Sequence, residues 1–128
     1  MTMGRYILVN GVPTPEPNLM KWAAWMEESR KTGEWLVAKT VINKEIKVST
    51  VFLGLDHSFD LEGPLEIFET MIFGGPKNEW CWRYATKADA QHGHEVAVAE
   101  AKEEHYGPRE WSPRKGTCFC KRPHYGDH

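Results

Sequence analysis

The stretch Ile46-Lys47-Val48-Ser49-Thr50-Val51-Phe52-Leu53 decides the fold of this chain. Apolar and polar side chains alternate along it, and a period of two is typical of a strand with one buried face. The second face turns apolar toward the end of the stretch, which indicates that the strand enters the interior of a sheet there. The segment Leu65 to Phe73 is apolar on both faces and predicts a second, central strand. We therefore expect the core to run from Val48 to Phe73.

The flanking segments add three strands and two helices. Strands are predicted at residues 5–9, 35–41 and 80–84, and the spacing of apolar residues predicts an amphipathic helix over about 17–31. The residues Thr86-Lys87-Ala88-Asp89 have the pattern of a helix N-cap and predict a second helix that ends near residue 104. This order predicts an α+β fold: a mainly antiparallel sheet of about five strands, with two helices packed on one face. We assign residues 1–106 to this single domain and residues 107–128 to an irregular, basic tail that contains Cys and His.

Composition limits the classes of protein to which the chain can belong. The chain has 128 residues, 41% of them hydrophobic and 27% charged, which is typical of one globular domain. The longest apolar run, Val51 to Leu55, is far too short to span a bilayer, so we expect no membrane partner. The first residues lack the apolar segment of a signal peptide, and three cysteines do not suit a secreted disulfide framework. These observations predict a cytoplasmic protein.

The tail differs from the rest of the chain in charge and in metal-binding residue types. From Gly107 onward it has five basic and two acidic residues, a balance of +3, which leaves −5 of the total −2 for residues 1–106. A basic tail suits contact with an anionic partner such as nucleic acid, and a merely solvated tail is the alternative. Four zinc-ligand types recur in it, at Cys118, Cys120, His124 and His128. They form either a closed, structural zinc site or part of an irregular tail without metal, and one residue between two cysteine ligands is an unusual spacing for zinc.

A set of polar residues in the body is the second candidate site. Asp56 and His57 lie in a loop after a buried strand, where functional side chains often occur. Glu69 has apolar neighbours on its strand and must be paired, and Arg83 on the next strand is the natural partner. The two residues form either a structural ion pair or a polar pocket for a ligand. His94 lies on the apolar face of the second helix, as a hydrogen-bonded core residue or as a ligand.

Two tryptophans extend this candidate ligand site. Trp80 and Trp82 share one face of a strand. They form either an open patch, which stacks bases or binds a partner, or a pair that is covered by a helix or packed on the other hairpin strand. Cys81 between them is interpreted as a packing residue. The chain has no glycine-rich phosphate loop and no nucleophile elbow. A metal-dependent hydrolase or nuclease would require Asp56, His57, Glu69 and His94 to converge on one point.

The sequence resembles a group of small uncharacterised proteins encoded by tailed bacteriophages and prophages. The resemblance covers roughly residues 5–100 and leaves the tail outside. It is carried by the blocks Arg5-Tyr6-Ile7-Leu8, Lys47 to Phe59, Phe68 to Gly75, Trp82-Arg83-Tyr84-Ala85-Thr86 and Gly93-His94-Glu95. It implies a phage-encoded protein that acts in a bacterial cytoplasm, and it implies no activity and no catalytic residue.

From these observations we expect a non-enzymatic phage accessory protein that binds a host macromolecule, most simply a host protein, with counter-defence as one role. The missing catalytic motif, the aromatic pair and the acidic body favour this reading. The alternatives are a module that binds a small molecule or nucleotide at Arg83 and the tryptophans, and the metal-dependent hydrolase or nuclease. A homo-oligomer is compatible with all three.

Overall fold

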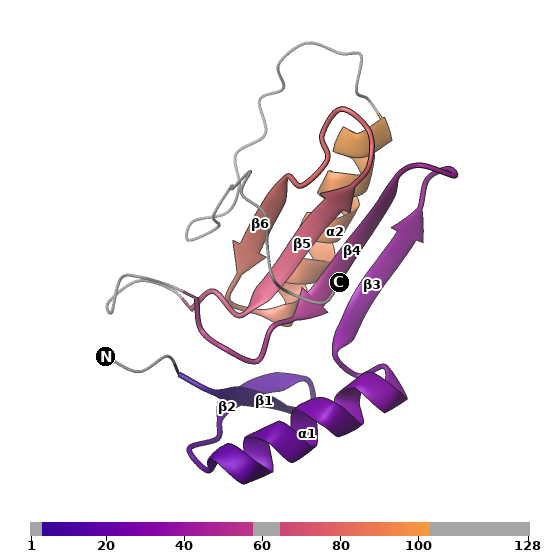
Figure 1. The fold of residues 1–128 in the computed structure, drawn as a ribbon. Coiled ribbons are helices and arrows are strands. Elements are labelled where there is room, and N and C mark those ends of the chain that lie inside the picture. The colour runs from indigo at the N-terminus through magenta and orange to yellow at the C-terminus, as the bar shows by residue number, and fades with distance from the viewer. Residues whose placement is uncertain (1–3, 58–64, 103–128) are drawn as a thin grey trace.

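The computed structural model describes residues 4–57 and 65–102. The strands are β1 (Tyr6–Val9), β2 (Val12–Pro15), β3 (Leu36–Val41), β4 (Lys47–Phe52), β5 (Phe68–Phe73) and β6 (Cys81–Tyr84), and the helices are α1 (Leu19–Thr32) and α2 (Lys87–Lys102). They confirm the α+β class and the antiparallel strands. We expected one sheet of about five strands, and the structure has two sheets, β1-β2 and β3-β4-β5-β6 (Figure 1). Neither described helix has the length and apolar character needed to cross a membrane.

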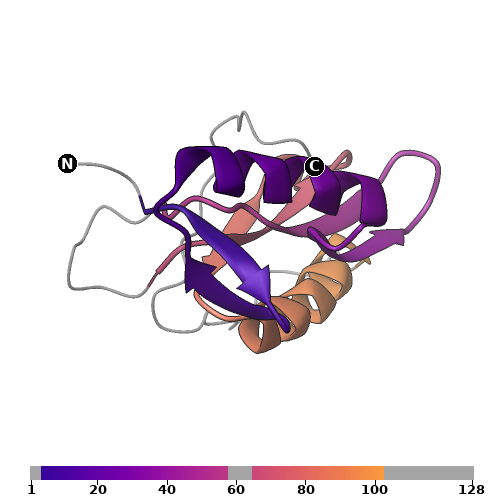
Figure 2. The same ribbon diagram turned by 90° about the horizontal axis from the view of Figure 1, so that it is seen from below.

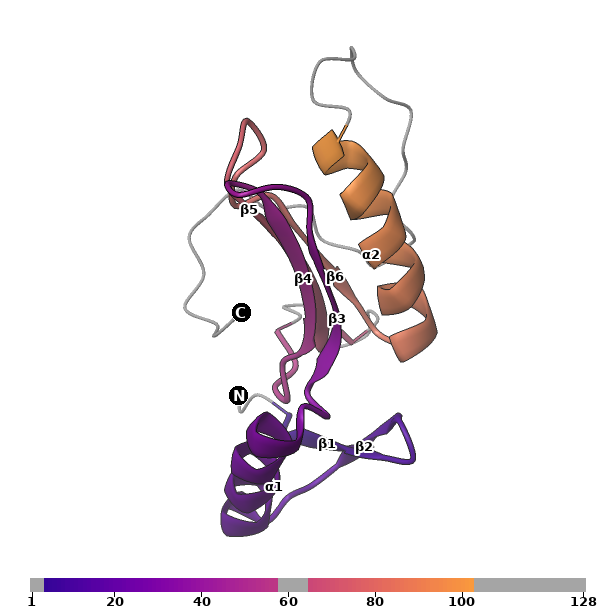
Figure 3. The same cartoon turned by 90° about the vertical axis from the view of Figure 1, so that its right-hand side faces the viewer.

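The main core lies between the four-stranded sheet and α2. The helix packs against all four strands, and in Figure 3 it runs along one side of them. The large buried side chains on this side of the sheet are Val48, Phe52, Phe68, Ile72, Trp82 and Tyr84. The buried apolar side chains that α2 contributes are small: Ala90, Ala97 and Ala101. Small residues allow a helix to approach a sheet closely. Both central strands, β4 and β5, are buried. The two strands of the expected core from Val48 to Phe73 are thus buried, and residues 58–64 between them lie outside the described residues.

The first three elements form a separate layer, which we call the N-terminal unit (β1, β2 and α1). Its hairpin turns at Asn10 and Gly11, whose φ values of 53° and 79° are those of a two-residue turn that matches the twist of the strands. The helix α1 begins after Asn18, whose side chain accepts a hydrogen bond from the Lys21 amide at 2.9 Å. It ends at Gly33, which has the left-handed φ of 87°. Figure 2 shows this unit in front of the four-stranded sheet.

The N-terminal unit is fixed to the end of the main sheet rather than to its face. The Gly54 carbonyl, just beyond β4, accepts hydrogen bonds from the Tyr6 amide at 2.9 Å and from Trp22 Nε1 at 3.0 Å. The Trp25 ring meets the Phe52 ring edge-on, at 5.7 Å between centroids. We expected both helices on one sheet face, whereas α1 packs chiefly against β1. An amphipathic stripe shows which side of a helix is buried, but it does not show which surface buries it.

Candidate functional site

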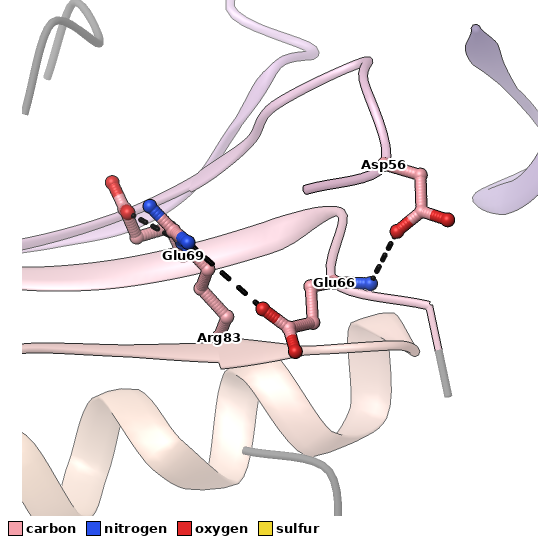
Figure 4. Close-up of polar contacts among 4 residues, drawn as sticks. All are labelled: Asp56, Glu66, Glu69 and Arg83. Carbon is pink, nitrogen blue, oxygen red and sulfur yellow. Dashed lines mark hydrogen bonds and ion pairs between the residues drawn. The ribbon is translucent and has the colours of Figure 1, made fainter. Parts of the chain in front are cut away.

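The polar residues of the body occupy both faces of the four-stranded sheet, and the first group surrounds Arg83. Glu69 and Arg83 are register partners on β5 and β6, so their side chains leave the sheet on the same face. Arg83 Nε donates a hydrogen bond to Glu69 Oε2 at 3.0 Å (Figure 4). Glu69 is 1% exposed and Arg83 7% exposed, so each charge is buried with an opposite charge beside it. The expected pairing of Glu69 with Arg83 is confirmed.

Two more carboxylates lie around this pair. Glu66 Oε1 is 3.9 Å from Arg83 Nη1, and Asp56 Oδ1 accepts a hydrogen bond from the Glu66 amide at 3.0 Å (Figure 4). The His57 amide in turn donates to the Glu66 carbonyl at 3.1 Å. Asp56 and His57, which follow β4, therefore contact Glu66, which precedes β5. This is the described part of the loop in which the sequence predicted functional residues.

Burial and charge shift the pKa of Glu66 in opposite directions. Partial burial raises its pKa by disfavouring the ionised form, the Arg83 guanidinium lowers it, and the Asp56 carboxylate raises it. The pKa is raised overall, so burial outweighs the attraction of Arg83. The reason lies in the geometry, because Arg83 directs its Nε at Glu69 and approaches Glu66 only at 3.9 Å.

The other face of the sheet carries a buried polar chain beneath α2. His94 Nδ1 and Thr50 Oγ1 are 2.7 Å apart, and His94 Nε2 and Thr40 Oγ1 are 2.9 Å apart. The Thr50 hydroxyl continues the chain to Thr70 Oγ1 at 2.6 Å. Both ring nitrogens of His94 are thus hydrogen-bonded, and burial lowers the pKa of the imidazole. His94 is the hydrogen-bonded core residue that was one of its two interpretations.

The candidate metal-dependent site does not converge in this fold. Glu69 and Thr70 are neighbours on β5 and point to opposite faces. Because Thr70 belongs to the chain of hydrogen bonds that ends at His94, Glu69 and His94 lie on opposite sides of the sheet. Within residues 4–57 and 65–102, no group of three or more His, Cys, Asp or Glu residues could hold a metal ion. The requirement for a hydrolase or nuclease built on Asp56, His57, Glu69 and His94 is therefore not met.

The two tryptophans are close together but do not form an open platform. Trp80 and Trp82 meet edge-on, with ring centroids 6.3 Å apart. Trp82 is 1% exposed and lies under α2, while Trp80 is half-buried with Lys77 Nζ 5.3 Å from its ring. Of the two interpretations, the pair covered by a helix fits Trp82. Binding of a ligand at Trp80, Trp82, Arg83 and the neighbouring carboxylates stays a prediction.

Cys81 is buried as expected and has an additional covalent bond. It is the first residue of β6, is 0% exposed, and contacts Met71, its register partner on β5. It is also disulfide-bonded. The predicted zinc ligands Cys118, Cys120, His124 and His128 lie outside the described residues, as do the domain boundary at residue 106 and the basic tail.

Sequence reasoning missed two buried polar contacts. The three threonines around His94 come from separate strands, and the signal for them was a hydroxyl on an otherwise apolar face. The second is an ion pair between Lys77, in the β5–β6 connection, and Glu100, near the end of α2. Lys77 Nζ also donates to the Glu100 carbonyl at 3.0 Å, so the connection is fixed to the last turns of the helix. No local pattern pairs these two residues, because the contact exists only after α2 has docked.

Comparison with known proteins gives no relative for this arrangement. Scans of family models, of curated proteins and of solved structures each found no match.

Proposed function

We propose that this chain is a non-enzymatic accessory protein that binds a host protein through its N-terminal unit. One observation carries the proposal, namely the place of the exposed apolar side chains. Among the described residues five large hydrophobic side chains are exposed, and four belong to this unit: Val9 at 46%, Val12 at 60%, Leu19 at 54% and Met20 at 76%. Single exposed apolar residues are ordinary, but several on one small unit are typical of an interaction surface.

The arrangement of the polar residues supports binding over catalysis. The body's candidate groups are distributed over two faces of a sheet, and Glu69, Arg83 and His94 are engaged in internal pairs. A reacting centre needs an acid, a base or a metal ligand that converge on one point. An apolar surface on a unit at the end of the sheet needs no such convergence.

The resemblance to phage proteins gives the proposal its setting. A phage-encoded protein would act in the cytoplasm of the infected bacterium, and a host defence component is one class of target. The basic tail predicted from the sequence would provide a second contact to nucleic acid. This setting is inferred from the resemblance alone.

The test is recovery of a host protein by the tagged full chain from bacterial lysate. The variant Leu19→Glu/Met20→Glu places two negative charges at the exposed start of α1. Acidic side chains interact favourably with the helix dipole there, so the variant should fold. The control is Val41→Glu, because Val41 on β3 is 64% exposed but lies outside the unit.

We expect the wild type and Val41→Glu to recover the same host protein, and the double variant to lose it by about tenfold or more, as for a substituted interface anchor. Absence of any specific partner, or equal recovery by the double variant, would contradict the proposal.

A further inference from the structure

The strand β3 forms the more open edge of the four-stranded sheet. The strand order β3-β4-β5-β6 leaves β3 and β6 at the two edges (Figure 1). All four residues of β6 are buried, whereas none of the six residues of β3 is, and Lys39 and Val41 are exposed. Val41 is 64% exposed and is the one large exposed hydrophobic residue of the described chain that lies outside the N-terminal unit. The edge at β3 is therefore the part of this sheet that another strand can reach.

The hydrogen bonds to β4 show which backbone groups of β3 point away from the sheet. The Ile42 amide donates to the Ile46 carbonyl at 2.9 Å, so these two residues form a hydrogen-bonded pair of the antiparallel ladder. Such pairs alternate with pairs that exchange no hydrogen bond, and Lys39 and Val41 occupy positions of the second kind. The amide and carbonyl groups of Lys39 and Val41 therefore point outward. A row of such groups is a template for one more strand.

The small sheet has a different kind of edge. Its strand β2 carries Pro13 and Pro15 within four residues. Proline has no amide hydrogen to donate, so two alternate positions of β2 cannot support a further strand. The strand β3 contains no proline. The sequence thus blocks strand addition at β2 and permits it at β3.

We propose that β3 pairs with β3 of a second copy of this chain, antiparallel and in a register centred on Thr40. A β-bulge between Leu36 and Ala38 interrupts the strand, and its regular part runs from Ala38 to Ile42. Thr40 is the midpoint of this part, so a two-fold axis there uses the whole regular segment of both copies. The proposal is independent of the proposed function, which concerns the N-terminal unit.

The same register satisfies the outward backbone groups and avoids a charge repulsion. It places Lys39 opposite the partner's Val41, where the two residues exchange both of their hydrogen bonds, and the two-fold axis repeats this pair. The exposed Val41 side chain then packs against the hydrocarbon part of the partner's Lys39. A register centred on Lys39 would instead place two ammonium groups directly opposite each other, which destabilises a pair of strands.

The helix α2 leaves room for this arrangement. It packs most closely on β4 and β5, and the two-fold axis puts both copies of α2 on the same side of one continuous sheet. The midline between β4 and β5 is separated from the same midline of the second copy by about four strand spacings, or roughly 19 Å. A helix with its side chains is only about 12 Å across. The two copies of α2 therefore do not collide.

The pairing is tested by sedimentation velocity of the full chain across a series of concentrations. A single pair of strands makes a small interface, so we expect a weak, reversible dimer. Val41→Pro removes an outward amide hydrogen that takes no part in the bonds to β4, and it should raise the dissociation constant about tenfold or more. The control is Val41→Thr, which keeps the amide and the branched shape and should stay within about threefold of the wild type.

A wild type that is monomeric at every concentration would overturn the proposal and leave β3 to a strand of another protein. A dimer that Val41→Pro does not weaken would overturn it as well. Circular dichroism reports whether Val41→Pro folds. If this variant does not fold, two charge variants of Val41 decide instead.

The charge variants Val41→Glu and Val41→Lys test the register. Opposite the partner's Lys39, the glutamate gains an attraction and the lysine a repulsion. We therefore expect the dissociation constant of Val41→Lys to exceed that of Val41→Glu by about tenfold, and Lys39→Ala to remove most of this difference. Lys47 lies beside Val41 within one copy, so the stability of each variant is measured separately. Equal dissociation constants, or a difference that persists in Lys39→Ala, would overturn the proposal.

Discussion

Arg83 lies between two carboxylates that differ in what they contribute. Glu69 is buried and receives the Arg83 Nε hydrogen bond, whereas Glu66 is more exposed and lies 3.9 Å away. Removing one member of a buried ion pair leaves the other charge without compensation, and a partly exposed contact at the rim contributes little. Glu69 therefore forms a structural ion pair with Arg83, whereas Glu66 is a peripheral charge near the same guanidinium.

Substitution of each glutamate tests this difference. We expect Glu69→Gln to lower the free energy of unfolding by about 3 kcal/mol, because Arg83 keeps its burial and loses its partner. Glu66→Gln is the same nearly isosteric substitution at the neighbouring carboxylate, and it should alter the free energy of unfolding by less than about 1 kcal/mol. Urea denaturation monitored by tryptophan fluorescence measures both. Equal losses for the two variants would mean that Glu66 shares the pairing.

What the sequence predicts at this scale depends on how far apart the partners are. The pairing of Glu69 with Arg83 could be predicted from the sequence, because a hairpin joins their strands and an isolated carboxylate on an apolar face needs a partner. The partners of His94 could not be predicted, because Thr40 and Thr50 form hydrogen bonds with it only after α2 docks on the sheet. Glu66 was missed because nothing in the sequence distinguishes it from a solvated residue at the start of the predicted strand Leu65 to Phe73.

At the level of elements, the contact between α2 and β6 sets a strict steric limit. A Cβ atom built on Gly93 would overlap the Tyr84 hydroxyl and the adjoining ring carbons. Both residues are buried, and burial also raises the pKa of the Tyr84 hydroxyl. Gly93 therefore permits the helix to approach the sheet closely, despite the low helix propensity of glycine.

Gly93→Ala tests this limit. Alanine favours a helix by about 1 kcal/mol over glycine, but overpacking a buried contact costs about 1–3 kcal/mol. Because the overlap involves ring atoms that cannot rotate away, we expect a net loss of stability and a lower midpoint of thermal unfolding. The control is Gln91→Ala, at an exposed position of the same helix, which should change stability by at most about 0.5 kcal/mol. A stabilised Gly93→Ala would show that α2 moves outward at little cost.

Periodicity predicted the elements better than their packing. The expected starts of both helices and the expected end of the first lie within about two residues of the observed ones, because caps and apolar spacing are local signals. The end expected near residue 104 lies outside the described residues. The place of α1 was not predictable in the same way. Its apolar stripe fitted a sheet face as well as it fitted the hairpin and the end of β4, and the choice depends on the contacts of Trp22 and Trp25 with residues about thirty positions away.

For the whole molecule, two buried groups make stability depend on pH with opposite signs. The pKa of His94 is lowered from its usual 6.5, so the unfolded chain takes up a proton first as the pH falls below that value, and stability is lost. The pKa of Glu66 is raised from its usual 4.5, so the folded state takes up a proton first on acidification, and stability is regained. As the pH falls, the loss of stability through His94 begins at about pH 6.5. The gain of stability through Glu66 is complete at about pH 4.5.

The pH dependence of unfolding separates these two contributions. We expect the free energy of unfolding of the wild type to fall from pH 7 toward pH 5, because His94 is enclosed by three strands and a helix whereas Glu66 keeps contact with solvent. His94→Gln should flatten this fall, and Glu66→Gln should steepen it by removing the opposing gain. His92→Gln, at an exposed position of the same helix, is the control and should leave the profile unchanged. Denaturant titrations at half-unit pH intervals measure the slopes. A profile of His94→Gln that parallels the wild type would assign the acid sensitivity to groups other than this buried imidazole.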